Sequence, residues 1–135
     1  MKRCALVVIS ALLFAGCAGM RTRSAEEIRY ARYTQPREVV WDAVREVLGQ
    51  KYEILEEYEA RGIMVTGWRL EFEADTAYRS RVTAWIVGPG PYRVEFDVEM
   101  YTRQIDALTD ARTKEGEQAR ADELYRALHE RLRRR

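Results

Sequence analysis

This sequence contains few cysteines and histidines, and its net charge is close to zero. The 135 residues include two cysteines and one histidine, and 23 Lys and Arg against 22 Asp and Glu leave a net charge of +1. Both cysteines, Cys4 and Cys17, lie near the N-terminus, so the rest of the chain has no thiol for a disulfide framework or a cysteine nucleophile. A nearly neutral chain has no overall field that attracts nucleic acid. We therefore expect no nucleic-acid partner, no metal and no cofactor.

Long hydrophobic runs are also missing. The apolar stretch Ala5 to Phe14 is interrupted only by Ser10 and follows Lys2 and Arg3. It is too short to cross a bilayer core of ~30 Å as a helix. A short positive segment followed by an apolar run of this length is typical of an export signal. The pattern predicts that residues 1–16 are a signal peptide.

The end of this segment, Phe14-Ala15-Gly16-Cys17, resembles a bacterial lipobox, with Phe14 where that family usually has Leu. The resemblance implies cleavage after Gly16, acylation of Cys17 and a membrane anchor; several acyl chains on one residue hold a protein stably. Ala18, where an Asp favours the inner membrane in related lipoproteins, implies the periplasmic face of the outer membrane. The alternative is an ordinary secretory signal in which Cys17 has no role.

Residues 17–26 have few large apolar side chains and predict the lipidated Cys17 followed by a tether. Residues 27–135 are the length of one domain. Its first part, residues 28–34, is expected to be a short edge strand. Removal of the signal would take away Lys2 and Arg3 and leave the body close to neutral.

A helix is predicted from Pro36 to Gly49. Proline suits the first turn, because its missing N–H would be unpaired there. One apolar stripe follows helical spacing: Val40, Val44, Val47 and Leu48. We expect Gly49 to end the helix in the left-handed conformation.

Four segments then alternate with the period of a β-strand: 52–58, 63–73, 78–87 and 92–101. The second is expected to place five side chains on one apolar face: Met64, Thr66, Trp68, Leu70 and Phe72. Trp68 is therefore predicted to belong to the core. In the third and fourth strands, Trp85 and the charged residues share the opposite, solvated face.

The Gly-Pro-Gly-Pro sequence between the last two strands predicts a chain reversal. If the reversal is centred on residue 89, Arg81 faces Asp97 and Trp85 faces Arg93. If it is centred on residue 90, Arg81 faces Glu99. Both registers give complementary pairs on the solvated face.

Residues 102–113 are expected to be a connection or the start of the last helix. Residues 114–134 have helical spacing with apolar residues at 121, 124, 128 and 132. The predicted fold is α+β: a helix, an antiparallel meander of three to four strands, and a long C-terminal helix packed on one face of the sheet.

This order of elements resembles the helix-grip domains of the C-component lipoprotein of the outer-membrane β-barrel assembly machinery. The similarity covers residues 36–132, and its motifs are Pro36–Val44 with Leu48, Tyr52–Ile54, Ala60–Ile63 and Leu124–Leu128. It implies a helix-grip-like fold. It does not transfer a function, because the motifs are apolar spacings and a shared fold can carry different functions.

The sequence contains few residues in patterns that suit catalysis or metal binding. His129, beside Glu130, lacks a second ligand at helical spacing and is expected to be a solvated surface residue. The acidic run of residues 53–59 lacks the spacing of a calcium loop and is expected to be a solvated edge. Glu95, Asp97 and Glu99 face arginines, which keep carboxylates ionised. We therefore predict that the protein is not an enzyme.

Trp85 beside Arg93 has the composition of an interface hot spot, so both are predicted to bind a partner protein in the envelope. The alternative is that residues 27–34 cover Trp85. The alternative function is a carrier that holds a small apolar ligand between sheet and helix. Trp68, Phe72, Phe96 and Met100 are large enough to fill that space, which favours the interaction module. The arginine-rich end, residues 131–135, could contact anionic lipid; a solvated helix end is the simpler interpretation.

Overall fold

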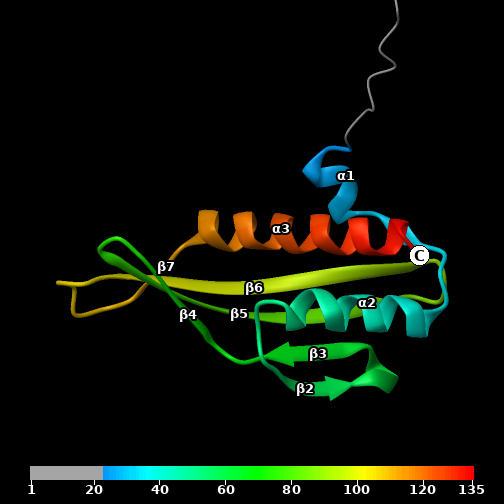
Figure 1. The fold of residues 1–135 in the computed structure, drawn as a ribbon, viewed down its shortest axis with the longest axis horizontal. Helices are drawn as coiled ribbons and strands as arrows, with labels where there is room; N and C mark the ends of the chain where they lie inside the picture. Colours follow the sequence, from blue (N-terminus) through cyan, green and yellow to red (C-terminus); the bar gives the residue numbers. More distant parts are fainter. Residues whose placement is uncertain (1–22) are drawn as a thin grey trace, which may run out of the picture.

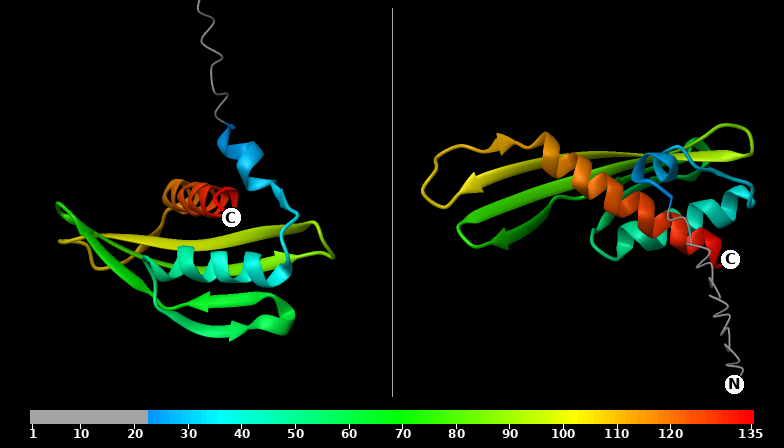
Figure 2. Two further views of the ribbon diagram at one scale, coloured as in Figure 1. Left: turned by 45° about the vertical axis from the view of Figure 1, so that its right-hand side comes forward. Right: turned by 90° about the horizontal axis from the view of Figure 1, so that it is seen from above.

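The computed structural model describes residues 23–135, which form one sheet and three α-helices (Figure 1). The helices are α1 (Ala25–Arg29), α2 (Arg37–Gly49) and α3 (Lys114–Arg133). Both long helices, α2 and α3, lie on the same side of the sheet (Figure 2). The predicted α+β class, with a long C-terminal helix on one sheet face, is confirmed.

The described residues form seven antiparallel strands, more than the three or four expected. These are β1 (Arg32–Tyr33), β2 (Ile54–Tyr58), β3 (Ile63–Thr66), β4 (Arg69–Glu73), β5 (Thr76–Val87), β6 (Tyr92–Gln104) and β7 (Ala111–Arg112). A short 3-10 turn, η1 (Glu59–Arg61), joins β2 to β3. The strand order is β1-β6-β5-β3-β2; β4 also pairs with β5, and β7 with β6.

The core lies between the sheet and the two long helices. The predicted stripe of α2 is buried, and so is Trp41 beside it. From α3, Leu124, Leu128 and Leu132 pack against the same layer. The sheet contributes the inward row of β5 and β6: Val82, Ala84, Ile86, Val94, Phe96, Val98 and Met100. Residues 23–135 therefore contain a complete hydrophobic core.

The helix ends differ in detail from the expectation. Pro36 is the N-cap of α2, as its lack of an N–H allows. Gly49 is the last helical residue, and Gln50 continues in a right-handed conformation, so the predicted left-handed cap at Gly49 is wrong. At the other long helix, the Thr113 side chain accepts a hydrogen bond from the Gly116 N–H.

The N-terminal part is less extended than predicted. Ser24 caps α1, and the helix begins at Ala25, inside the segment expected to be a tether. Of the predicted strand 28–34, residues Arg32 and Tyr33 are extended and pair with the edge of β6. Ile28 is helical and packs into the core. The predictions for residues 1–16 and for Cys17 lie outside the described residues.

The predicted strand 63–73 is in fact two strands with a break at Gly67-Trp68. Met64 pairs with Ala84, whereas Leu70 pairs with Arg79, so one additional residue is inserted between the two registers. The Val82 N–H donates to the Thr66 hydroxyl at 2.9 Å where the ladder is interrupted. Because side chains alternate along a strand, one inserted residue moves all later side chains to the opposite face. The prediction that residues 64–72 share one face is therefore wrong after Thr66.

The β5–β6 hairpin takes the second of the two predicted registers. Arg81 lies opposite Glu99, and their side chains form two hydrogen bonds of 3.0 and 3.1 Å. Trp85 lies opposite Glu95, and Arg93 lies opposite Val87. The register with Trp85 facing Arg93 is therefore wrong. The even alternation of the two faces, buried inward and more exposed outward, is confirmed.

Candidate interaction surface

The side of the sheet opposite to α2 and α3 carries a mixture of aromatic, aliphatic and arginine side chains. We call it the outer face. Its rows are given by strand register: Ile63 and Val65 of β3; Leu70 and Phe72 of β4; Ala77, Arg79, Arg81, Thr83 and Trp85 of β5; Arg93, Glu95, Asp97, Glu99, Tyr101 and Arg103 of β6. Trp68, in the break before β4, also lies here because it contacts Arg79 and Arg81.

Two arginines and two aromatic rings form a stacked cluster on this face. The Arg79 guanidinium lies 4.8 Å from the Trp68 ring centroid and 5.0 Å from that of Tyr101. Arg81 lies 4.7 Å from the Trp68 ring, and the two rings meet edge to face at 5.9 Å. Such contacts hold long side chains in fixed positions while leaving their faces accessible.

The charges in the cluster are largely neutralised. Arg81 is held by Glu99, and Arg79 pairs with Asp110 at 2.9 Å. Exposed ion pairs of this kind contribute ~0–1 kcal/mol each to stability. In this cluster, the main effect of the ion pairs is to fix the planar guanidinium groups beside the aromatic rings.

Exposed aliphatic and aromatic groups continue from the cluster to the end of the sheet. Leu70 is 60% exposed, Phe72 is 71% exposed and Ile105 is 70% exposed. Together with Arg79, Tyr101 and Arg103 they line an open hollow of about 440 Å³. Contiguous exposed apolar groups on a domain of this size are unusual unless they contact another molecule.

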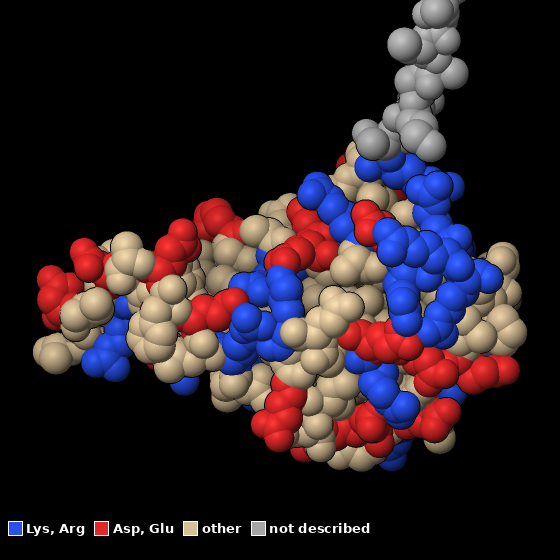
Figure 3. All heavy atoms as spheres, in the orientation of Figure 1, with Lys and Arg blue, Asp and Glu red and all other residues tan. Residues whose placement is uncertain are grey.

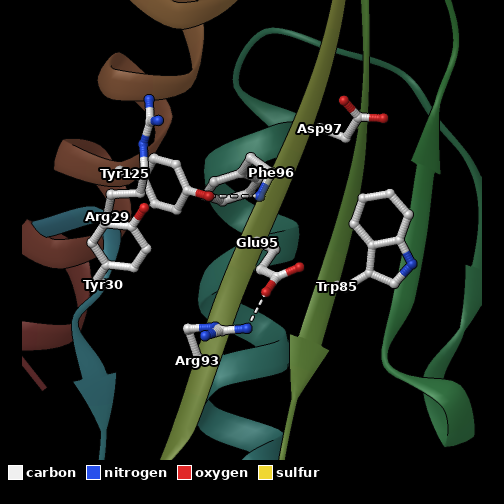
Figure 4. A pocket seen from close by; sticks show the side chains of 8 residues that line it. All are labelled: Arg29, Tyr30, Trp85, Arg93, Glu95, Phe96, Asp97 and Tyr125. Atoms are coloured by element: carbon white, nitrogen blue, oxygen red, sulfur yellow. Dashed lines mark hydrogen bonds and ion pairs between the residues drawn. The ribbon is translucent and has the colours of Figure 1, made fainter. Parts of the chain in front are cut away.

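A second hollow, of about 300 Å³, lies where the edge of β6 meets α1 and α3 (Figure 4). Trp85 and Arg93, the two residues predicted to bind a partner, both line it. They do not contact each other as a cation–π pair; Arg93 forms an ion pair with Glu95 instead. Trp85 is half-buried on the outer face, and its ring lies across β6 from Tyr125 in Figure 4.

The edge of β6 at this hollow is closed by a side chain of α3. The Phe96 N–H donates to the Tyr125 hydroxyl at 3.0 Å, and the two rings meet edge to face. Burial raises the pKa of Tyr125, so the hydroxyl stays protonated at neutral pH. β6 pairs with β1 near its start and with β7 near its end, and the stretch between these pairings is an open edge. The Tyr125 hydroxyl occupies the Phe96 N–H of this edge, which would otherwise be available to another strand.

Two other predicted placements are wrong. Trp68, predicted to be core, is 43% exposed on the outer face because of the inserted residue at the break. His129, predicted to be a solvated surface residue, is buried against Tyr33, with its Nδ1 unpaired within residues 23–135. Burial lowers the pKa of His129, and Arg23 and Arg133 lower it further.

The structure places the acidic run at the sheet edge, as predicted: all but the first residue of β2 are exposed. In the part of the chain from residue 23 onward, no three His, Cys, Asp or Glu side chains lie together as metal ligands would. None of the helices in that part is long and apolar enough to cross a membrane.

The sequence predicted Trp85 and Arg93 as contact residues, which stays a prediction, and assigned Trp68, Leu70 and Phe72 of the outer face to the core. One signal was present. Gly67 interrupts the alternating pattern, and a glycine inside a strand often marks a bulge. In the structure, the Leu55 side chain packs within 3.3 Å of where a Cβ at Gly67 would lie.

No family model matches this chain, and no curated protein sequence matches it.

Proposed function

We propose that this protein is a non-enzymatic, lipid-anchored module that binds a partner protein of the bacterial envelope through the outer face of its sheet. The observation that carries the proposal is the row of exposed apolar side chains, Trp68, Leu70 and Phe72, beside the stacked arginines. Trp, Tyr and Arg are the residues most enriched at interface hot spots.

The outer face also indicates the chemistry of the partner. Leu70, Phe72 and Ile105 offer an apolar hollow. At its rim Arg103 donates through Nε to the Ala107 carbonyl at 3.0 Å, and no carboxylate among residues 23–135 pairs with it. A partner segment with an apolar side chain beside a carboxylate would fill the hollow and neutralise Arg103.

The anchor follows from the lipobox resemblance at Cys17. Six residues separate Cys17 from Ser24, the N-cap of α1. A span of that length reaches about 25 Å when extended. The domain would therefore act within a short distance of the membrane, which we propose to be the periplasmic face of the outer membrane.

The carrier alternative has less support. The space between sheet and helices is occupied by side chains that are almost completely buried, among them Val44, Leu48, Met64 and Leu128. Met100 and Phe72 do line a hollow of about 440 Å³ near the start of α3, but Glu71, Glu73 and Glu123 share its lining. Three carboxylates make a poor wall for an apolar ligand.

The docking surface can be tested with the double variant Leu70→Ser/Phe72→Ser. Both side chains are mostly exposed, so folding should be unaffected, while capture of partner proteins after crosslinking in cells should fall about tenfold or more. Leu55→Ser is the matched control, because Leu55 is as exposed as Leu70 but lies on β2. If the double variant and the control recover the same proteins in the same amounts, the outer face is not the docking surface.

The anchor is tested separately with Cys17→Ala. The variant should lose acyl labelling and leave the membrane fraction, because cleavage and acylation both depend on that thiol. Unchanged labelling and membrane partition would contradict the lipoprotein assignment without affecting the test of the outer face.

A further inference from the structure

Arginine side chains gather on one part of the helix-bearing side, over the C-terminal half of α3 and beside the start of α1 (Figure 3). We call this region the arginine surface. It consists of Arg23, Arg126, Arg131, Arg133, Arg134 and Arg135, all exposed. Arg126 and Arg133 are seven residues apart on α3 and so share one stripe of the helix.

These arginines have few anionic partners. Arg131 and Arg135 share a single carboxylate, that of Glu46, and Arg134 lies 3.9 Å from the exposed Glu130. Within residues 23–135, no carboxylate forms an ion pair with Arg23, Arg126 or Arg133. The surface therefore has an excess of positive charge, unlike the cluster on the outer face, where Arg79 and Arg81 each have a carboxylate of their own.

The position of this surface relative to the chain entry is the second observation. Arg23 directly precedes the N-cap of α1, and α1 packs on α3 through the ion pair of Arg29 with Asp122. Arg23 follows Cys17 by six residues, which extends to about 20 Å. An acyl anchor at Cys17 would thus hold the arginine surface within reach of lipid headgroups, where excess Lys and Arg are attracted by anionic phosphates.

We propose that the arginine surface binds the phosphate groups of an anionic lipid bilayer and thereby orients the domain. The proposal deepens the proposed function, since it relies on anchoring at the same membrane. The arginine surface and the outer face lie on opposite sides of the sheet. With the arginines against the bilayer, the outer face is directed away from it, toward the partner.

The test uses residues 23–135 without an acyl chain, because this part contains the complete core. The domain should sediment with vesicles containing about 30% phosphatidylglycerol and not with pure phosphatidylcholine, and salt should weaken the binding. Arg126→Gln/Arg133→Gln should reduce the vesicle affinity about tenfold or more. Arg61→Gln/Lys114→Gln removes the same charge outside both surfaces and should change the affinity by no more than about twofold.

Four outcomes would overturn the proposal. These are equal binding to both kinds of vesicle, the same loss in the control pair, complete competition by free glycerol phosphate at matched phosphate concentration, and tighter binding to a short DNA duplex than to vesicles. Circular dichroism confirms that each variant is folded. The vesicle experiment uses protein without an acyl chain. A negative result would therefore contradict only the role of the arginine surface, and the Cys17 and Leu70/Phe72 experiments would still test the anchor and the docking surface.

Discussion

The two faces of the β5–β6 hairpin handle polar groups in different ways. On the face covered by helices, some polar groups are paired in fixed geometry: the hydroxyls of Tyr52 and Ser80 are 2.8 Å apart, and Thr66 accepts from Val82. Others, among them Trp41 Nε1 and His129 Nδ1, are buried without a partner within residues 23–135. On the outer face, Arg79 is shared between two rings and a carboxylate. A buried polar group without a partner costs ~1–3 kcal/mol, whereas an exposed ion pair contributes ~0–1 kcal/mol.

This difference indicates which face can change without loss of the fold. Burial on the covered face supplies most of the stability, so its residues are constrained by packing. The outer face depends on weaker contacts, and its exposed apolar groups add little to folding. The outer face can therefore carry residues for binding without loss of the fold.

Adjacent residues of β5 allow the strongest test of this comparison. Val82 is completely buried and points to the helices, whereas Thr83 points outward opposite Asp97. Val82→Lys should lose several kcal/mol, most or all of the stability of a small domain, because it buries an unpaired charge. Thr83→Lys should lose less than about 1 kcal/mol, since the new ammonium lies beside a carboxylate.

Chemical denaturation of residues 23–135 measures both variants. Similar losses for Val82→Lys and Thr83→Lys would show that the two faces are equally constrained, and the comparison would be wrong.

The sequence predicts the faces well where local patterns decide them, and poorly where distant contacts do. Strand alternation was sufficient for β5 and β6, and charge pairing across the hairpin restricted the register to two choices. The inserted residue near Gly67 depends on the pairing of β3 with both β2 and β5. The local alternation of the sequence carries no information about these pairings. The same holds for His129, whose burial arises from β1, an element folded back from the N-terminus.

Acid should affect the covered side through His129. Its pKa in the folded protein is lowered, first by burial and then by Arg23 and Arg133, whereas an unfolded chain has the ordinary value of 6.5. The unfolded state thus binds the proton more readily, so the stability contributed by neutral His129 is complete above about pH 6.5 and is lost as the pH falls below it.

His129→Gln should therefore flatten the change in melting temperature between about pH 7.5 and pH 5. The sequence contains no second histidine whose titration could produce the same change. Thermal melts of both proteins across this range measure it. An equally steep decline in the variant would assign the acid sensitivity to other groups.

A small effect on stability is expected for Trp85→Ala, which is also the sharpest test of the outer face. Trp85 is half-buried between Ile63 and Glu95 on neighbouring strands, so its loss should cost about 1 kcal/mol, a shift of a few degrees in melting temperature. If the partner covers it, capture should weaken about thirtyfold, since an interface tryptophan commonly contributes 2 kcal/mol or more. Trp41→Ala, in the core beneath α2, should instead lose about 3–5 kcal/mol. A loss of that size at Trp85 would place it with the covered face and remove it from the docking surface; normal stability with undiminished capture would confine binding to the Trp68 end of the sheet.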